Sequence, residues 1–197
     1  IAPDDLAARV PALFAEGWDG FNITLPHKAA VAALCADVTP RAALAGAVNT
    51  LVRGADGWQG DNTDGVGLVA DLRALGIPVQ GRRVLILGAG GATRGILGPL
   101  LAEAPAQLVV SNRNPWKPEA LAEAFQAVGT VIPRTHLALK GDAYDLVINA
   151  TSAGHGGTVP RLPVGMFSAG ADAYDLSYGT AHGPFASWAM AAGASRV

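Results

Sequence analysis

Lys28 and Asp64 are the two side chains of this sequence best suited to acid–base chemistry. Lys28 follows the stretch FNITLP (21–26) and is one of only three lysines in the chain. Asp64, in GDNTDGVG, stands where a helix should begin, and it could pair with the ammonium of Lys28. Such a pair could deliver a proton to a carbonyl oxygen on which negative charge develops during hydride transfer. Asn49, in AVNT, offers an amide that can donate and accept hydrogen bonds.

The spacing of these residues leaves other interpretations open. Asp64 could serve only as the N-cap of the helix that follows it, and an isolated lysine is usually solvated at the protein surface. A catalytic role therefore depends on whether the rest of the chain provides a site for a hydride carrier.

The stretch RVLILGAGGATRG (83–95) has the pattern of a dinucleotide phosphate loop. A buried strand runs directly into a glycine-rich turn and then into a helix, which is the context that this motif requires. Gly88 should permit the tight turn, and Gly90 and Gly91 should let the backbone approach a pyrophosphate at the helix N-terminus. The small residues expected to contact the cofactor here are Gly88, Ala89, Gly90, Gly91 and Ala92.

The match to the strict G-x-G-x-x-G pattern is incomplete. Thr93 stands where the third glycine would be, so an ordinary strand-to-helix turn is the alternative interpretation. The succession of strand, loop, helix and next strand favours the dinucleotide site.

The loop after the next strand, SNRNPWK (111–117), predicts which dinucleotide binds. NAD-binding proteins place an Asp or Glu about 20 residues after the glycine loop to hold the ribose 2′-hydroxyl. This chain has Asn112, Arg113 and Lys117 there instead. A guanidinium can bind a 2′-phosphate through two charge-assisted hydrogen bonds, whereas a carboxylate would repel it. The sequence therefore predicts NADP, with a solvated basic loop as the alternative.

Small polar residues end two further buried strands. DLVINATSAG ends in Asn149, Thr151 and Ser152, and DAYDLSY ends in Asp175 and Tyr178. Ligands of open α/β sheets bind just outside the carboxyl ends of the strands, so Asn149, Thr151 and Ser152 are candidates to line a nicotinamide pocket. Taken alone, the same residue types are common in turns.

The first part of the chain should supply short strands and helices that position Lys28 and Asp64. The expected elements are helices at 4–16, 27–38, 39–46 and 66–76, and strands at 21–25, 47–53 and 58–60. Thr39 suits an N-cap with Pro40 in the first helical position, and Gly76 suits a C-cap.

The second part alternates short buried strands with helical stretches. Continuous runs of Val, Ile and Leu, as in RVLIL and DLVIN, are typical of parallel strands covered on both faces. We expect an α/β fold with two domains: a smaller, partial substrate and catalytic domain over 1–76 and a Rossmann-like, parallel-sheet NADP-binding domain over 77–197.

Composition excludes several other classes. Half of the 197 residues are hydrophobic, and the formal net charge is -2 without a basic stripe, which argues against a nucleic-acid-binding surface. No apolar run reaches the roughly 18–20 residues of a membrane span. The single Cys35 fits a reducing, cytoplasmic location and a core position. The four histidines lack a repeated spacing, so we expect no metal site: His27, His136, His155 and His182.

Six motifs occur in an order that resembles the shikimate dehydrogenase family. They are NITLPHK, AGAVNT, GDNTDGVG, GAGGATRG, SNRN and INATSAG, and they run over essentially the whole chain. No single motif is specific, but the set is. The resemblance implies reversible, NADPH-dependent reduction of 3-dehydroshikimate to shikimate, a step in aromatic amino-acid biosynthesis.

The resemblance also implies roles for individual residues. Lys28 and Asp64 would form the catalytic pair, Thr24, Asn49 and Asp64 would hold the substrate hydroxyls, and Tyr178 would lie near the substrate. Lysine is a reluctant proton donor at neutral pH, and a neighbouring carboxylate favours its charged form. Lys28 could therefore act partly as a fixed positive charge that stabilises the oxyanion.

The chain departs from the family pattern at both ends. The family has an initial strand-and-helix unit that binds the substrate carboxylate and final helices that carry a glutamine, and we expect both outside the stretch from Ile1 to Val197. Two alternatives stay open: a dual quinate/shikimate dehydrogenase, and a non-catalytic NADP-binding module. We expect a monomer or homodimer with small-molecule partners.

Overall fold

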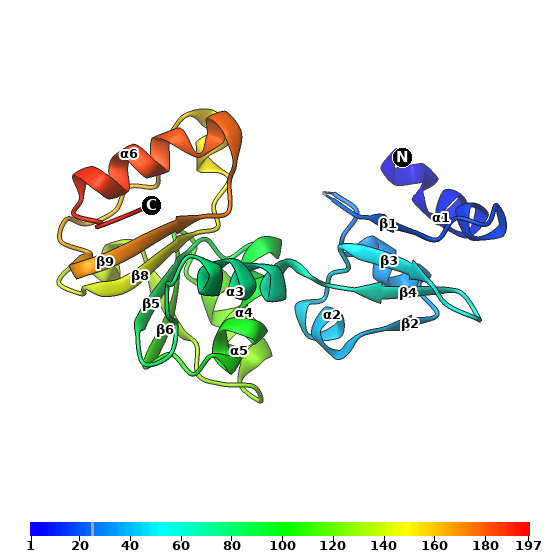
Figure 1. Ribbon diagram of the computed structural model, residues 1–197, viewed down its shortest axis with the longest axis horizontal. Coiled ribbons are helices and arrows are strands. Elements are labelled where there is room, and N and C mark those ends of the chain that lie inside the picture. Colours follow the sequence, from blue (N-terminus) through cyan, green and yellow to red (C-terminus); the bar gives the residue numbers. More distant parts are fainter. Residues whose placement is uncertain (25) are drawn as a thin grey trace.

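Two β-sheets organise the chain in the computed structural model, which describes residues 1–24 and 26–197 apart from the side chain of His155. The smaller sheet has the strand order β1-β3-β4-β2, and the larger has the order β7-β6-β5-β8-β9. The two sheets lie in separate lobes, and the chain passes from β4 in one lobe to α3 beside the other (Figure 1).

The smaller lobe is built around a mixed sheet. β1 and β4 both pair antiparallel with β3, and β2 pairs parallel with β4. The indole N–H of Trp58 donates to the carbonyl of Val10 at 2.9 Å, which fixes α1 on the core. The elements are η1 (Pro3–Asp5), α1 (Leu6–Ala15), β1 (Gly20–Asn22), η2 (Ala30–Leu34), β2 (Asp37–Val38), α2 (Pro40–Ala45), β3 (Thr50–Arg53) and β4 (Trp58–Asp61).

Two expected elements of this lobe differ in the structure. The strand expected over 21–25 is only Gly20–Asn22, because the carbonyl of Thr24 accepts from His27 N–H in a turn; Leu25 lies outside the described residues. The helix expected over 27–38 is instead the short 3₁₀ helix η2 followed by β2. Pairing of β2 with β4 overrides the helix propensity of this alanine-rich stretch.

The caps of α2 follow the expectation. The hydroxyl of Thr39 accepts from the N–H of Ala42, Pro40 occupies the first turn, and Gly46 ends the helix in the left-handed region at φ 60°. This short helix lies against α4 of the larger lobe, where Leu44 packs on the core. The two lobes therefore contact each other close to Lys28 and Asp64.

The larger lobe is a five-stranded sheet in which every neighbouring pair is parallel. Val84 and Ile86 of β5 face one apolar cluster, and Leu85 and Leu87 face another on the opposite side. The predicted α/β fold, with a parallel sheet covered on both faces, is confirmed. The elements are α3 (Asp64–Ala74), β5 (Arg83–Leu87), α4 (Gly91–Ala102), β6 (Gln107–Asn112), α5 (Trp116–Phe125), β7 (Ile132–Thr135), η3 (Leu137–Leu139), β8 (Tyr144–Asn149), η4 (Ala153–Gly156), β9 (Phe167–Asp175), η5 (Gly179–Ala181) and α6 (Gly183–Ala191).

Helix α3 packs with the larger sheet. Its buried Leu68 and Leu72 share one core with α4 and α5. We placed α3 in the smaller domain (1–76) from the sequence, and that boundary stays a prediction. By side-chain packing, the helix that begins at Asp64 sits on the larger lobe.

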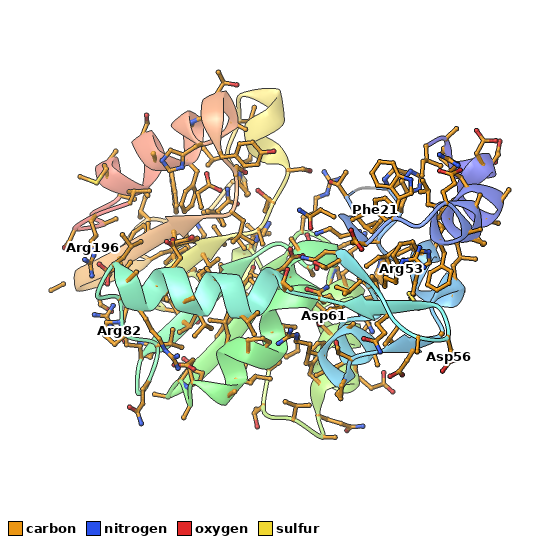
Figure 2. The ribbon with its side chains drawn as sticks, turned by 45° about the vertical axis from the view of Figure 1, so that its right-hand side comes forward. Phe21, Arg53, Asp56, Asp61, Arg82 and Arg196 are labelled. Carbon is orange, nitrogen blue, oxygen red and sulfur yellow. The ribbon has the colours of Figure 1, made fainter. Side chains whose placement is uncertain are left out.

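The far end of α3 is held by charged side chains. Asp172 of β9 is buried and accepts from both Arg82 and Arg196, which lie at the same end of the larger lobe (Figure 2). Arg196 also donates to the carbonyls of Leu75 and Gly76, just after α3 ends. These bonds fix the axis of α3 against the sheet.

Helices α3 and α4 approach each other so closely that only glycine fits between them. A Cβ on Gly65 would lie 2.6 Å from the carbonyl oxygen of Gly95 and 2.6 Å from Cγ of Pro99. A Cβ on Gly67, two residues further along α3, would meet nothing within 4 Å. The crossing point is thus set at Gly65, directly after Asp64.

We expect Gly65→Ala to lower the free energy of unfolding by about 2–3 kcal/mol, because overpacking would push the two helices apart. Gly67→Ala is the matched control, and it should raise stability by about 0.5–1 kcal/mol through helix propensity. Urea unfolding followed by circular dichroism measures both. Equal stabilities of the two variants would contradict the close crossing.

Candidate active site

Lys28 and Asp64 form an ion pair across the junction of the two lobes. The Lys28 Nζ lies 2.7 Å from Asp64 Oδ2, and the two side chains are 24% and 28% exposed. Lys28 stands in the turn after β1, where its carbonyl accepts from the N–H of Val48 at 2.7 Å. Asp64 is the first residue of α3, where a carboxylate is favoured by the helix dipole. The structure therefore brings the expected pair together and leaves it accessible to solvent.

Asn49 holds the other oxygen of the same carboxylate. Its Nδ2 donates to Asp64 Oδ1 at 2.6 Å, and its Oδ1 accepts from the N–H of Thr63 at 2.9 Å and the hydroxyl of Thr50 at 2.8 Å. These bonds fix which way the amide of Asn49 points. Both carboxylate oxygens of Asp64 thus have a partner, and its rotamer is set from two sides.

Asn62, a residue that we did not single out from the sequence, fixes the loop before Asp64. Its side chain is buried, donates to the carbonyl of Ala47 at 3.0 Å, and accepts from the N–H of Asp64 at 3.2 Å. The signal in the sequence was the run of four polar residues DNTD. Asn62 locks that run onto the segment before β3, which also carries Asn49.

Asp61 anchors the start of this loop. It lies where β4 leaves the smaller lobe (Figure 2), and it accepts from Arg41, from the hydroxyl of Thr39 and from the N–H of Asn62. The Arg41 guanidinium, together with these hydrogen bonds, lowers the pKa of Asp61 to about 2. The anchor therefore stays ionised at any pH at which the protein works.

The pair sits directly against the helix of the glycine loop. A Cβ on Gly95 of α4 would lie 3.3 Å from Asp64 Oδ2 and 3.1 Å from Asn62 Oδ1. The absence of a side chain at Gly95 therefore lets the carboxylate lie beside the first turns of α4. Thr24, expected to hold substrate, is exposed in the turn that leads to Lys28.

The glycine loop has the conformation expected of a phosphate-binding turn. Gly88 has φ 102°, and a Cβ there would lie 2.9 Å from the carbonyl oxygen of Ala150. Positions Gly90 and Gly91 face open space. Thr93 is buried, and its hydroxyl donates to the carbonyl of Gly88 at 2.9 Å. Thr93 thus closes the turn in place of the third glycine.

A cleft of about 870 Å³ opens at the carboxyl ends of β5, β6, β7 and β8. In this strand order β5 lies between β6 and β8, which is the switch point where open α/β sheets bind ligands. Its walls come from five segments of the larger lobe. The lining residues are Gly88, Ala89, Gly90, Asn112, Arg113, Asn114, Lys117, Thr135, His136, Leu137, Ala150, Thr151, Ser152, Ala153, Thr158, Val159, Pro160 and Arg161.

The expected 2′-phosphate residues share one wall of this cleft. Asn112, Arg113 and Lys117 all line it, and Arg113 and Lys117 are exposed to solvent. Among the charged or titratable residues of the lining, the sequence analysis missed His136 and Arg161. The strand-end rule could have found His136, which follows β7, whereas Arg161 lies in an irregular segment with no pattern to mark it.

Four residues expected to contact ligands are not part of the lining of this cleft. Asn149 is 1% exposed, donates to Asp175 at 2.9 Å and accepts from the hydroxyl of Thr151 at 2.8 Å, so it holds the wall from behind. Gly91 and Ala92 are exposed in the first turn of α4 and are not part of the lining. Tyr178 is 90% exposed and borders a separate hollow.

The described residues contain no group of three or more His, Cys, Asp or Glu side chains that could hold a metal ion. None of the helices in the described ranges is long and apolar enough to cross a membrane. Burial raises the pKa of the Cys35 thiol, whose sulfur contacts the carbonyl of Val31. Cys35 therefore behaves as a small core residue.

Two family models match the chain. The shikimate dehydrogenase substrate binding domain matches residues 1–51, and the shikimate / quinate 5-dehydrogenase model matches residues 72–158. The NADP(+) shikimate dehydrogenase of Aeromonas salmonicida (strain A449) is 47% identical over 197 residues, which is 100% of this chain and 72% of that protein.

Solved structures give the same result. An Ael1 enzyme from Pseudomonas putida superposes with a TM-score of 0.90 at 38% identity, covering 99% of this chain and 72% of that one. Shikimate 5-dehydrogenase from Thermus thermophilus, in complex with NADP(H) and shikimate, superposes with a TM-score of 0.79 at 32% identity, covering 100% and 72%. The resemblance seen in the motifs is confirmed, and the chain belongs to the shikimate dehydrogenase family.

Proposed function

We propose that this protein catalyses the reversible, NADPH-dependent reduction of 3-dehydroshikimate to shikimate. The Lys28–Asp64 pair carries the proposal, because it lies against the helix that begins in the glycine loop. The activity agrees with the name of the relative from Aeromonas salmonicida and with the ligands of the structure from Thermus thermophilus.

The residues of the cleft fit NADPH. Open space at Gly90 and Gly91 admits a pyrophosphate to the N-terminus of α4. Arg113 and Lys117 place positive charge after β6 for the 2′-phosphate, and Asn112 replaces the carboxylate that would bind the hydroxyl of NAD. When bound, NADPH supplies the hydride to the carbonyl carbon of the substrate.

Lys28 handles the proton of the reaction. As the carbonyl carbon is reduced, the carbonyl oxygen becomes an alkoxide, and the Lys28 ammonium donates a hydrogen bond and then its proton to it. In the reverse direction the neutral amine takes the proton from the hydroxyl. Asp64 holds the ammonium by charge, and Asn49 holds Asp64. The substrate hydroxyls are bound by Thr24, Asn49 and Asp64, with Tyr178 contributing nearby.

Thr151 forms part of the nicotinamide wall, and Asn149 acts behind it as a positioning residue. We further propose that the protein works in the cytoplasm as a monomer or homodimer, with these small molecules as its partners. The balanced net charge of -2 and the single cysteine support this setting.

Lys28→Ala should lower kcat for shikimate oxidation by about 100- to 10,000-fold, because the proton acceptor is lost. NADPH binding should persist, since Lys28 is not part of the cofactor cleft. Steady-state kinetics and fluorescence titration with NADPH measure the two effects in protein expressed with any flanking residues its gene encodes. Lys140→Ala, at an exposed turn, is the control and should keep its turnover; full turnover of Lys28→Ala would refute the assignment.

Lys28→Arg separates proton transfer from fixed charge. Arginine keeps the positive charge but does not release its proton at neutral pH. If Lys28 transfers the proton, Lys28→Arg should lose as much kcat as Lys28→Ala. A variant that keeps most of its turnover would show that positive charge alone is sufficient at this position.

Arg113→Ala should weaken NADPH binding about 10- to 100-fold, the worth of charge-assisted hydrogen bonds to a phosphate. NADH binding should change little, because NADH lacks the 2′-phosphate. The matched control is Arg134→Ala, whose guanidinium donates to the adjacent carbonyl of Pro133 and is not part of the cleft lining. Dissociation constants for both nucleotides, measured side by side, check the prediction; an equal loss for NADH would count against it.

A further inference from the structure

His136 lies inside the cofactor cleft and has no role in the reaction as described so far. It follows the last residue of β7, Thr135, and lines the cleft together with Arg113. Its Nδ1 lies 2.8 Å from the hydroxyl of Ser111, a side chain that is fully buried at the end of β6. The hydrogen bond to buried Ser111 thus fixes the ring on the side away from the cleft. His136 lies at the end of the cleft where we propose that the 2′-phosphate binds.

We propose that His136 is a binding residue for the 2′-phosphate of NADP that gains a proton when the phosphate binds. The inference rests on the function proposed above. It adds that the affinity for NADP, but not for NAD, increases as the pH falls through the titration range of this histidine.

The sheet register brings His136 and Arg113 together. β6 and β7 run parallel, and Asn112 lies opposite Thr135 at the edge where both strands end. The next residue of each strand, Arg113 and His136, therefore enters the cleft from neighbouring positions. With Nδ1 occupied by Ser111, the ring has Nε2 left for a ligand, and a protonated Nε2 can donate to a phosphate oxygen.

Ser111 suits both protonation states of the ring. Its hydroxyl can donate to Nδ1 of a neutral imidazole and can accept from Nδ1–H of an imidazolium. A change in charge at His136 therefore leaves no buried polar atom without a partner. A backbone N–H or a lysine in place of Ser111 could support only the neutral form.

Among the described residues, the charged groups that face this part of the cleft are all cationic. They are Arg113 after β6, Lys117 in α5 and Arg161 in the segment between η4 and β9, and none of the lining residues is acidic. Burial, and then the charge of Arg113, lower the pKa of His136. A bound phosphate dianion would place negative charge beside the imidazole ring of His136 and raise its pKa.

Phosphate binding and protonation of His136 should therefore strengthen each other. A ligand that raises the pKa of a group binds more tightly to the protonated form of that group. The gain in affinity is complete below the pKa of the free protein and is lost as the pH rises through the pKa of the complex. Its limit is about tenfold for each unit by which binding raises the pKa.

Titration calorimetry of NADP⁺ binding at pH 6.5, in two buffers of different ionisation enthalpy, gives the number of protons taken up. We expect greater uptake in the wild-type protein than in His136→Asn, which keeps a polar atom near Ser111, and in His136→Gln, which keeps one near the position of Nε2. The phosphate itself titrates at about pH 6. The titration of free NADP⁺ is common to all three proteins and cancels in the difference, and any difference at the bound phosphate is part of its coupling to His136.

Two controls isolate the effect. NAD⁺ should give the same uptake in all three proteins, because it lacks the 2′-phosphate. His27→Asn is the same change in the smaller lobe, where the ring contacts the carbonyl of Ile1, and it should match the wild type with NADP⁺. Between pH 8 and pH 5.5, the NADP⁺ affinity of the wild type relative to His136→Asn should rise by up to about tenfold for each unit of pKa change.

The outcomes are distinct. Wild-type protein that binds no NADP⁺ would overturn the proposed function and this inference together. Binding with equal proton uptake in wild type and both His136 variants would overturn this inference alone. As a direct check, the NMR titration of the His136 ring should move to higher pH on addition of 2′,5′-ADP, and an unmoved midpoint would also reject the proposal.

Discussion

The close crossing of α3 and α4 is the constraint on which the site depends. Gly65 and Gly95 contribute no side-chain atoms at the crossing point, so the backbone of α3 lies directly against Gly95 and Pro99 of α4. Asp64 begins the first helix, and the glycine loop leads into the second. The carboxylate that holds Lys28 is therefore placed beside α4, the helix that follows the glycine loop, by two residues that have no side chain. Polar residues of the smaller lobe only set its rotamer.

Acidic and basic side chains have different roles in different parts of this protein, although its formal net charge is only -2. The carboxylates at the junction of the lobes are already bound, Asp61 to Arg41 and Asp64 to Lys28. The cleft of the larger lobe has three cations in its lining, Arg113, Lys117 and Arg161, and no carboxylate is among its described lining residues. An anionic dinucleotide would therefore be attracted along the cleft, whereas the ammonium of Lys28 is already paired with Asp64.

Structural features that depend only on residues close together in the sequence could be predicted from it. The cap of α2 by Thr39, the buried β5 and the turn at Gly88 all follow from residue types within a few positions. The prediction of a helix over 27–38 was wrong because the end of this segment forms β2, which pairs with β4, a strand distant in sequence. A strand-end rule places Asn149 and Thr151 together, and it does not distinguish the residue in the cleft lining, Thr151, from Asn149, which hydrogen-bonds to it and to Asp175. Asn62 and His136 were missed because their partners, Ala47 and Ser111, lie on other segments.

Thr93 shows what the third glycine of a phosphate loop has to achieve. Glycine is usually required at that position because the helix packs so closely on the preceding strand that a side chain would not fit. Thr93 is fully buried there without displacing the turn, and its hydroxyl binds the carbonyl of Gly88. A buried backbone carbonyl needs a hydrogen-bond donor, and the carbonyl of Gly88 lies in a turn where that residue has φ 102°. Thr93 meets that need from its own side chain, so the loop keeps its shape with two glycines and one hydroxyl. A search that counts glycines would reject this loop, whereas one that asks how each carbonyl is satisfied would accept it.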